Sequence, residues 1–296
     1  MSLGHWPTAL GLGSRLIATI ELPSPGCRES KTMPQPFVHL HCHTDYSLLD
    51  GACEISQLMK LVAEQDMRAV AMTDHGNLFG AVEFYNSAKE KGVHPVIGCE
   101  VYVTQQSHTV KNEANRYNHL VLLCENQEGY KNLTNLVSTA FLDGFYYKPR
   151  IDKDLLAKHS KGIVALSACL RGDVNEALMS DRYEEGKRLA MEYRDIFGAN
   201  NFFLEMQDHG LDQDRVVLPQ LNRMSADTGI PLVVTNDSHY LRKDDALAQE
   251  VLVCINTGKT LSDDARMKFS TPAFYMKSRE EMMQLFGEVE HALDRT

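Results

Sequence analysis

Histidine and acidic side chains recur in this chain at spacings that could bring them together around metal ions. Two pairs stand two residues apart, His41 with His43 and Asp237 with His239. Residues two apart on an extended strand point to the same face. A further histidine lies in the Asp-His-Gly sequence at 74–76. Imidazole suits zinc and iron, whereas carboxylates suit manganese and magnesium, so the mixture favours a site for divalent cations.

Several isolated residues could extend such a cluster, and each has an ordinary explanation when taken alone. Glu100, His119 and Cys169 stand at or beside predicted strands, and Asp50 precedes a glycine. A single histidine at a strand end is more often structural, a buried cysteine is usually packing, and Asp-Gly is common in turns. His209 is left open between the two explanations. The coincidence of so many ligand-type residues at strand ends favours one shared cluster.

Phosphoester hydrolysis is the chemistry that fits this mixture. The residues are too many for one ion and suit two or three ions about 4 Å apart, bridged by carboxylates. The charge of three divalent ions exceeds that of the anionic ligands Asp50, Glu100, Asp237 and Cys169, so the site would attract phosphate. Further along, basic and aromatic residues could bind the substrate, although a solvated loop is an equally good explanation: Lys148, Arg150, Arg171, and Tyr147 or Tyr146.

Alternating strands and helices are predicted to position these residues. Short apolar runs predict strands at 37–41, 69–73, 96–103, 119–124, 163–167, 202–207 and 231–235. Amphipathic patterns predict helices at 54–66, 80–91, 128–142, 173–180, 182–197 and 244–257. This order favours an α/β fold with a mainly parallel sheet, open or closed into a barrel. The ligand-type residues fall at the carboxyl ends of its strands, where α/β folds place their chemistry.

His119 is the exception, because it begins its strand instead of ending it. If it belongs to the cluster, the strand 119–124 must run antiparallel to its neighbours. The helix 128–142 would then return to the end of the barrel that carries the site. It would deliver the loop 145–150 over the pocket.

Composition narrows the class of protein. The 296 residues carry a formal charge of −10, which argues against a protein that coats DNA with a basic face. The longest apolar runs have five residues, far short of the about 20 that a membrane helix needs. The 7 cysteines are scattered without a Cys-x-x-Cys pair, which favours a reducing, cytoplasmic setting.

The two ends of the chain differ from its middle. Residues 1–33 are rich in Gly, Pro and Ser and are predicted to be a leader or a disordered arm. Residues 34–285 hold the strand and helix pattern. Residues 286–296 are expected to begin a connector to a longer protein. Asp-x-Asp pairs at 152–154 and 212–214 fall at predicted helix starts, so no polymerase-type aspartate pair is expected here.

The motifs together resemble one known family. His-Cys-His-Thr-Asp-Tyr-Ser-Leu-Leu-Asp-Gly at 41–51 and Thr-Asp-His-Gly-Asn at 73–77 are similar to the PHP (polymerase and histidinol phosphatase) superfamily. The sequences Gly-Cys-Glu-Val-Tyr-Val at 98–103, His-Leu-Val-Leu-Leu at 119–123 and Thr-Asn-Asp-Ser-His-Tyr at 235–240 look like one branch of it. That branch is the amino-terminal domain of bacterial DNA polymerase III alpha subunits.

The resemblance implies a distorted (β/α)7 barrel of the PHP type and a centre for two or three divalent ions, whether zinc, manganese, iron or magnesium. Matched position by position, it implies nine ligands, of which Asp50, Asp237 and His239 are expected to act in catalysis: His41, His43, Asp50, His75, Glu100, His119, Cys169, Asp237 and His239.

The activity that the resemblance implies is a metal-dependent phosphoesterase, proposed in this family to be a 3′–5′ exonuclease that proofreads DNA. The expected partners are DNA 3′ ends, the rest of a polymerase chain and other replicase subunits, with no membrane. Two alternatives stay open. One is a catalytically silent, metal-stabilised scaffold that docks other replicase subunits, and the other is a free-standing PHP phosphatase.

Overall fold

A computed structural model describes residues 37–296, and the predicted arm at 1–33 lies outside the described residues. The strands are β1 (Ala69–Met72), β2 (His94–Thr104), β3 (Tyr117–Cys124), β4 (Arg150–Asp152), β5 (Ile163–Leu166), β6 (Phe202–Met206) and β7 (Leu232–Val234). Six of the seven predicted strands are present. β4 was not predicted.

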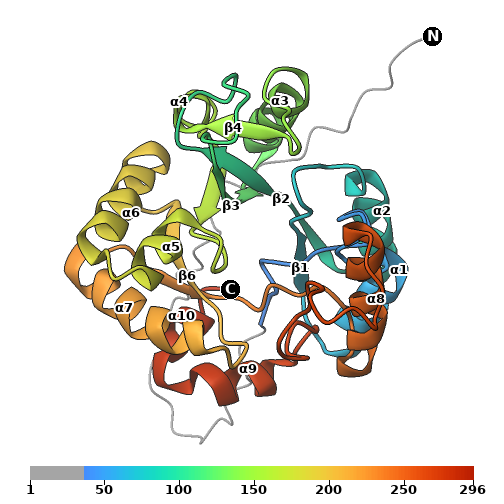
Figure 1. Cartoon of the computed structure of the whole chain (residues 1–296). Coiled ribbons are helices and arrows are strands. Elements are labelled where there is room, and N and C mark those ends of the chain that lie inside the picture. Colours follow the sequence, from blue (N-terminus) through green and yellow to red (C-terminus); the bar gives the residue numbers. More distant parts are fainter. Residues whose placement is uncertain (1–36) are drawn as a thin grey trace, which may run out of the picture. The chain divides into compact units, whose positions relative to one another are not determined.

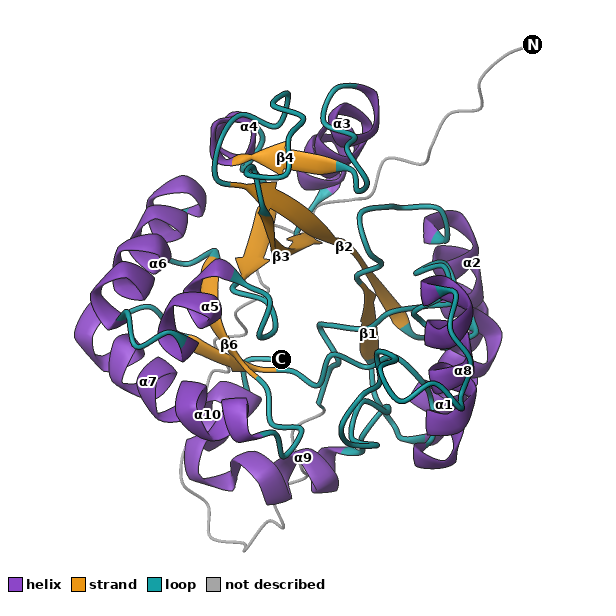
Figure 2. Ribbon diagram, viewed as in Figure 1, coloured by secondary structure: helices purple, strands orange, loops and turns teal. Residues whose placement is uncertain are grey.

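The helices surround the strands (Figure 2). They are α1 (Ile55–Glu64), α2 (Ala81–Lys91), α3 (Gln127–Leu142), α4 (Lys153–Lys158), α5 (Asp173–Met179), α6 (Tyr183–Phe197), α7 (Asp212–Thr228), α8 (Ala246–Thr257), α9 (Arg279–Phe286) and α10 (Glu290–Leu293), with 3-10 turns η1 (Lys243–Asp245) and η2 (Gly287–Val289). All six predicted helices form. None of the helices in the described part of the chain has the length and apolar composition needed to cross a membrane.

The sheet runs in the order β1-β2-β3-β5-β6-β7, and β4 pairs with the distal part of β2. Most neighbours are parallel, but β3 runs antiparallel to both β2 and β5. The orientation predicted from His119 is therefore confirmed. It brings the first residues of β3 to the same end of the sheet as the last residues of the parallel strands (Figure 1).

The segment 37–43 lies between β1 and the loop after β7, although it is not the regular strand that the sequence predicted at 37–41. On one side its carbonyls accept from β1, with Ala71 N–H donating to His39 O at 2.9 Å. On the other side it exchanges hydrogen bonds with Ser238, through His43 N–H and His41 O, at 2.8 and 3.1 Å. These bonds alternate between two neighbours and form no continuous ladder, so the fold is a distorted (β/α)7 barrel, as the resemblance implies.

The side chains inside the barrel are polar at the end where β3 begins and apolar further along the strands. On β3, His119, Val121 and Leu123 share one face, because side chains two apart point the same way. Val121 and Leu123 pack in a small buried cluster with Leu166 and Val233 of the neighbouring strands. The larger core lies between strands and helices and includes the predicted stripe of α1.

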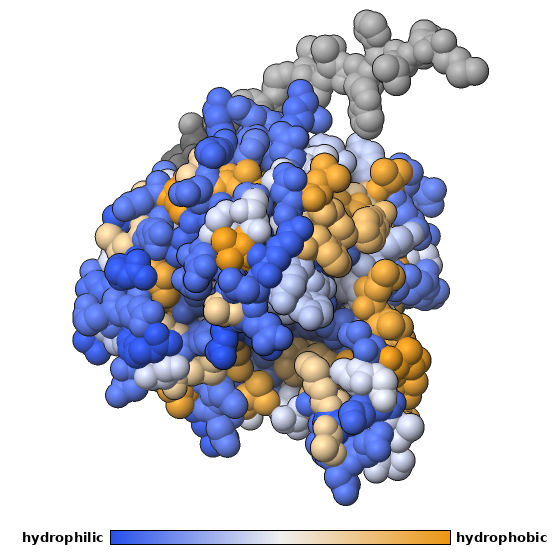
Figure 3. All heavy atoms as spheres, turned by 45° about the horizontal axis from the view of Figure 1, so that its top comes forward, coloured by the Kyte–Doolittle hydropathy of each residue, from blue (hydrophilic) through white to orange (hydrophobic). Residues whose placement is uncertain are grey.

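Residues 286–296 pack on the barrel at the amino ends of its strands. Ala292 and Leu293 are buried, Arg295 donates to Leu232 O at 3.0 Å, and the Thr296 hydroxyl accepts from Val38 N–H at 3.2 Å. Their assignment to a connector stays a prediction. On the face shown in Figure 3, the surface is mainly hydrophilic with separate apolar patches.

Candidate metal centre

Four donor atoms meet where the segment 37–43 lies beside β2 and the loop after β7. His41 Nε2 is 3.2 Å from His43 Nε2, 3.3 Å from Asp237 Oδ1 and 3.5 Å from Glu100 Oε1. His43 Nε2 is 3.1 Å from the same Asp237 oxygen. Ligand atoms about 2.0–2.2 Å from one tetrahedral cation are spaced about 3.3–3.6 Å from each other. The four donors have the spacing that a single ion would require.

Glu100 joins this group to a second one. Its Oε1 lies 2.8 Å from His119 Nδ1, and its Oε2 lies 2.6 Å from His75 Nδ1. The thiol of Cys169 is 3.8 Å from both Glu100 Oε1 and His119 Nδ1. One carboxylate thus faces ligand-type side chains on several sides, which is the arrangement of a carboxylate that bridges neighbouring ions.

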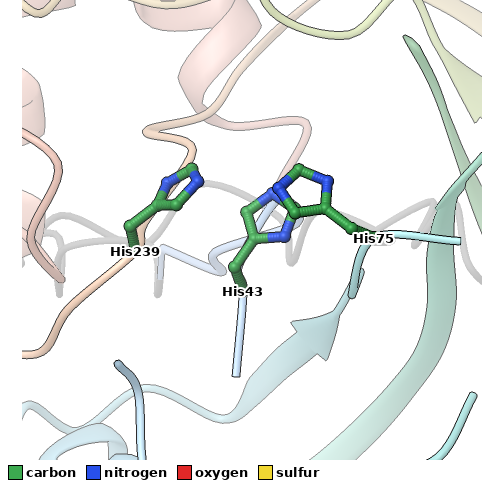
Figure 4. Close-up of side chains that lie close together, drawn as sticks. All are labelled: His43, His75 and His239. Carbon is green, nitrogen blue, oxygen red and sulfur yellow. The ribbon is translucent and has the colours of Figure 1, made fainter. Parts of the chain in front are cut away.

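A third group lies at the mouth of the cluster. His75 Nε2 is 3.1 Å from Asp50 Oδ2, and the ring of His43 stands 4.1 Å from that of His75 and 4.4 Å from that of His239. Figure 4 shows these three rings turned toward a common space. The side chain of Asp50 is 27% exposed and that of His75 is 15% exposed, so the centre opens to solvent on this side.

The structure therefore brings all nine predicted ligands into one connected cluster, with Glu100 and Asp237 at its centre. His209, which the sequence left open, lies apart from it. Its Nε2 is 2.9 Å from the Asn236 carbonyl, and its ring stacks on Phe274 at 3.9 Å, so packing and a backbone hydrogen bond account for it.

Glu205 is a part of the site that the sequence reasoning missed. Its Oε1 is 2.7 Å from His41 Nδ1, and both side chains are fully buried. Ligand histidines commonly pair their second ring nitrogen with a carboxylate, which fixes the orientation of the ring. The sequence did contain a sign of this role. Glu205 is a carboxylate within the apolar strand Phe202–Met206, where a buried charge needs a specific partner.

Asp74 and Ser47 hold His43 in a similar way. The carboxylate of Asp74 accepts from the Thr44 N–H and from the Ser47 hydroxyl, each at 2.7 Å. The Ser47 oxygen is 3.1 Å from His43 Nδ1 and accepts from the His75 N–H at 3.1 Å. This network fixes the loop after the segment 37–43, so the ligand nitrogens of His43 and His75 face the cluster.

The charges in the cluster shift its pKa values strongly. Burial would raise the pKa of Glu100, but His119 and His75 outweigh it and hold the pKa well below its usual range. Burial would lower the pKa of His75, but Glu100 and Asp50 raise it to about 10. Burial, with the charges of Glu100 and Asp237, raises the pKa of the Cys169 thiol well above its usual range. A thiolate here therefore needs a cation beside it, and metal uptake would release protons.

Several polar atoms of the cluster lack hydrogen bonds to one another, as expected for a site that binds more than one cation. Glu100 Oε2, His75 Nδ1 and Asp237 Oδ1 are buried and have no hydrogen-bond partner among residues 37–296. Glu100 Oε2 and His75 Nδ1 are close in distance, yet their orientation does not make a hydrogen bond. Unpaired buried polar atoms are costly, and cations bound in the cluster would offer them partners.

The predicted substrate residues separate into two groups. Arg150 is buried, and its guanidinium donates to the carbonyls of Gly144, Asn115 and Val110 at 3.1–3.2 Å. These bonds give it a structural role, since few of its donors remain for a phosphate. The exposed side chains of Arg171 and Tyr147 line a cavity, and Lys148 Nζ lies 5.5 Å over the ring of Tyr102.

The loop that follows α3 reaches the site end, as the sequence predicted. Tyr146 and Tyr147 line the same cavity as Arg171. Tyr102, over which Lys148 lies, has its ring centroid 5.3 Å from that of His119. The loop is therefore separated from the ligand cluster by a single side chain.

The curated proteins that are similar in sequence to this chain are several times longer than it. The chain is 47% identical over 270 residues to the DNA polymerase III subunit alpha of Helicobacter pylori, covering 88% of this chain and 22% of that protein. It is 44% identical over 260 residues to the DNA polymerase III subunit alpha of Thermus aquaticus, covering 86% of this chain and 21% of the relative. The chain thus spans about a fifth of the length of these proteins.

Among solved structures, a two-domain protein from Bacteroides vulgatus containing a predicted PHP-like metal-dependent phosphoesterase matches with a TM-score of 0.40 and 12% identity. This match covers 76% of the present chain and 56% of the other. The model of the PHP domain family matches residues 39–209, which is more than half of the chain. The matched range contains seven of the nine clustered residues, from His41 to Cys169. The chain belongs to the PHP domain family.

Proposed function

We propose that this chain is the PHP domain of a replicative DNA polymerase alpha subunit and that it hydrolyses phosphodiester bonds at DNA 3′ ends. The observation that carries the proposal is the convergence of nine ligand-type side chains on Glu100 and Asp237, at spacings suited to shared cations. The relatives, which are polymerase alpha subunits from bacteria, support the replicase setting and a cytoplasmic location.

Two or three divalent ions would be held by three groups of residues. The first group is His41, His43, Glu100 and Asp237. The second is Glu100, His119 and Cys169, and the third is Asp50, His75 and His239. When bound, such cations supply Lewis acidity toward a phosphoester and make water a nucleophile at neutral pH. Zinc, manganese, iron and magnesium all fit this mixture of ligands to some degree.

The residues at the mouth bear most directly on the substrate. Although burial opposes it, the pKa of Asp50 is lowered to about 2 by its hydrogen bond with His75, so this carboxylate is ionised at neutral pH. Ionised and partly exposed, it stands where a phosphoester would enter and can serve as a ligand there. The ionised Asp237 and the neighbouring His239 hold the opposite wall of the site. Glu205 and Ser47 keep His41 and His43 in place behind them.

The test uses the purified chain, loaded with manganese or zinc, on 5′-labelled single-stranded and 3′-mispaired DNA. We expect products that shorten stepwise from the 3′ end, and no products with His41→Ala or Asp237→Asn. Asp173→Asn, which changes a buried carboxylate outside the cluster, is the matched control and should retain activity. Equal activity in the ligand variants and the wild type would refute the proposal.

Two other outcomes separate the alternatives. Loss of thermal stability on chelation, with no hydrolysis at any metal loading, would support the scaffold that docks replicase subunits. Hydrolysis of small phosphate monoesters but not of DNA would support a free-standing phosphatase. DNA synthesis is not expected from the described residues, because Asp152 ends the short strand β4 with its side chain capping α4, and Asp212 begins α7.

A further inference from the structure

A cavity of about 710 Å³ lies beside the ligand cluster, and its walls come from segments far apart in the sequence. Tyr117 belongs to β3, Tyr146 and Tyr147 to the loop after α3, and Arg171 to the loop after β5. The size falls within the range of about 300–1,000 Å³ that is usual for small-molecule sites.

The cavity is joined to the cluster by direct contacts. Cys169 stands two residues before Arg171, whose carbonyl accepts from the His119 N–H at 3.0 Å. The ring of Tyr117 packs edge-on against Tyr102 at 5.0 Å, and Tyr102 in turn packs against His119 at 5.3 Å. The cavity is therefore the neighbouring space into which a chain-like substrate with one phosphoester at the ligands could extend.

Tyr147 is held in a conformation that packing does not explain. Its φ is 60°, in the left-handed region, which costs a residue with a Cβ about 1–2 kcal/mol. Its side chain is 75% exposed, so little burial offsets this strain. Its ring lies 4.6 Å from that of Tyr146, and the guanidinium of Arg150 lies 5.0 Å over the Tyr146 ring. The buried Arg150 thus supports a small aromatic platform at the cavity wall.

Three arginines, Arg116, Arg150 and Arg171, and two glutamates line the cavity, which leaves a net of one positive charge in a protein that is acidic overall. Arg116 and Arg171 line it with exposed side chains, and neither forms a salt bridge with a residue in 37–296. The acidic groups that face the cavity are Glu113 and Glu176, and Glu176 already accepts a hydrogen bond from the Asn118 amide. Exposed arginines beside aromatic rings are the combination with which proteins bind single-stranded nucleic acids.

We propose that this cavity binds the nucleotide next to the cleaved one, in a single strand, with the base stacked on Tyr147 and its phosphate paired with Arg171. This inference rests on the proposed function, because the cleaved nucleotide is defined by hydrolysis at the ligand cluster. Binding of a single strand can nevertheless be measured without hydrolysis. A base in a duplex does not expose its face to a tyrosine. The domain should therefore prefer single-stranded or frayed ends over paired ones.

The test measures binding of 5′-fluorescein-labelled oligothymidylate by fluorescence anisotropy, with chelator present so that nothing is hydrolysed. Tyr147→Ala should weaken binding about 5- to 150-fold, the equivalent of about 1–3 kcal/mol for one stacked base. Tyr147→Phe keeps the ring and should bind like the wild type. Tyr130→Ala, which removes an exposed tyrosine of α3 that does not line the cavity, is the matched control and should also bind normally.

Charge is tested separately. Arg171→Gln should weaken binding and lower the slope of log affinity against log salt by about 0.7, the value for one phosphate contact with a single strand. A fully paired duplex of the same length should bind more weakly than the single strand, and thymidine monophosphate should compete poorly.

The outcomes separate this inference from the proposed function. Unchanged strand affinity in both Tyr147→Ala and Arg171→Gln, or no binding by the wild type, would overturn the cavity assignment. Strand binding that depends on both residues, in a protein that hydrolyses no DNA at any metal loading, would uphold the cavity and refute the exonuclease.

Discussion

Replacing Glu205 with glutamine should weaken metal binding even though Glu205 is not a ligand. Three donors converge on its Oε1, namely His41 Nδ1 at 2.7 Å, Gln207 Nε2 at 3.0 Å and the Thr235 hydroxyl. Its Oε2 is buried without a hydrogen-bond partner in the described part of the chain. A glutamine should keep its oxygen toward the three donors and place its amide at the Oε2 position. The variant therefore preserves the geometry and removes the charge.

The magnitude follows from the burial of the pair. The side chains of His41 and Glu205 are both 0% exposed, so water cannot replace the lost carboxylate. Loss of such a histidine partner typically lowers metal affinity about 10–100-fold, which is about 1.4–2.8 kcal/mol. Glu205→Ala should cost more, because it also leaves three buried donors unpaired.

Isothermal titration of the metal-free protein with zinc, in competition with a chelator of known affinity, measures the change. Asp173→Asn is again the matched control, since Asp173 pairs with Tyr193 and lies outside the cluster. The double variant Glu205→Gln with His41→Ala should bind metal about as weakly as His41→Ala alone, because Glu205 acts through that histidine. Wild-type affinity in Glu205→Gln would refute the reasoning.

Four further outcomes are expected. Metal affinity should fall as pH drops through the neutral range to about 5, because the raised pKa values of His75 and Cys169 let protons compete with the metal, and binding should release protons into a weak buffer; retention unchanged at pH 5 would contradict the ligand set. Burial lowers the pKa of His39 to about 4, so on acidification the unfolded chain takes up this proton first, and stability is lost from about pH 6.5 toward pH 4. Chemical denaturation should show the wild type losing about 2 kcal/mol more than His39→Gln between pH 7 and pH 5, and equal losses would disprove the assignment. Gly129→Ala should lower the unfolding free energy by about 1–3 kcal/mol or more, because the new Cβ would lie 1.7 Å from the Gly162 carbonyl oxygen. Gly287→Ala, with open space around the new Cβ, is the control and should leave the unfolding free energy and the melting temperature nearly unchanged. Arg150→Met should destabilise the fold by about 1–3 kcal/mol by removing donors to buried carbonyls, and a fully stable variant would argue against its structural role.

Much of the arrangement of the ligand cluster could be predicted, because it follows from the two-residue periodicity of extended backbone. Residues two apart share a face of extended backbone, so His41 with His43 and Asp237 with His239 could be paired from the sequence, although neither pair lies within a regular strand of the structure. The position of His119 at the start of its strand required an antiparallel β3, and the structure has one. These predictions depend on spacing along one element, which the sequence records directly.

Other features depend on contacts between distant segments and could not be predicted in this way. The segment 37–41 has a strand-like sequence but bonds alternately to β1 and Ser238, so it stays irregular. Arg150 lies in a basic and aromatic loop typical of substrate binding, yet three carbonyls from other segments bury its guanidinium. Asp237 adopts a φ of 47°, a conformation that only the folded loop after β7 imposes.

The central claim, that the nine side chains jointly bind several cations, is tested most directly by anomalous diffraction from crystals grown with zinc or manganese. We expect anomalous peaks between His41, His43, Glu100 and Asp237, beside Cys169 and His119, and at Asp50 with His75 and His239. Peaks confined to the protein surface, with protonated side chains paired to each other in the cluster, would contradict it.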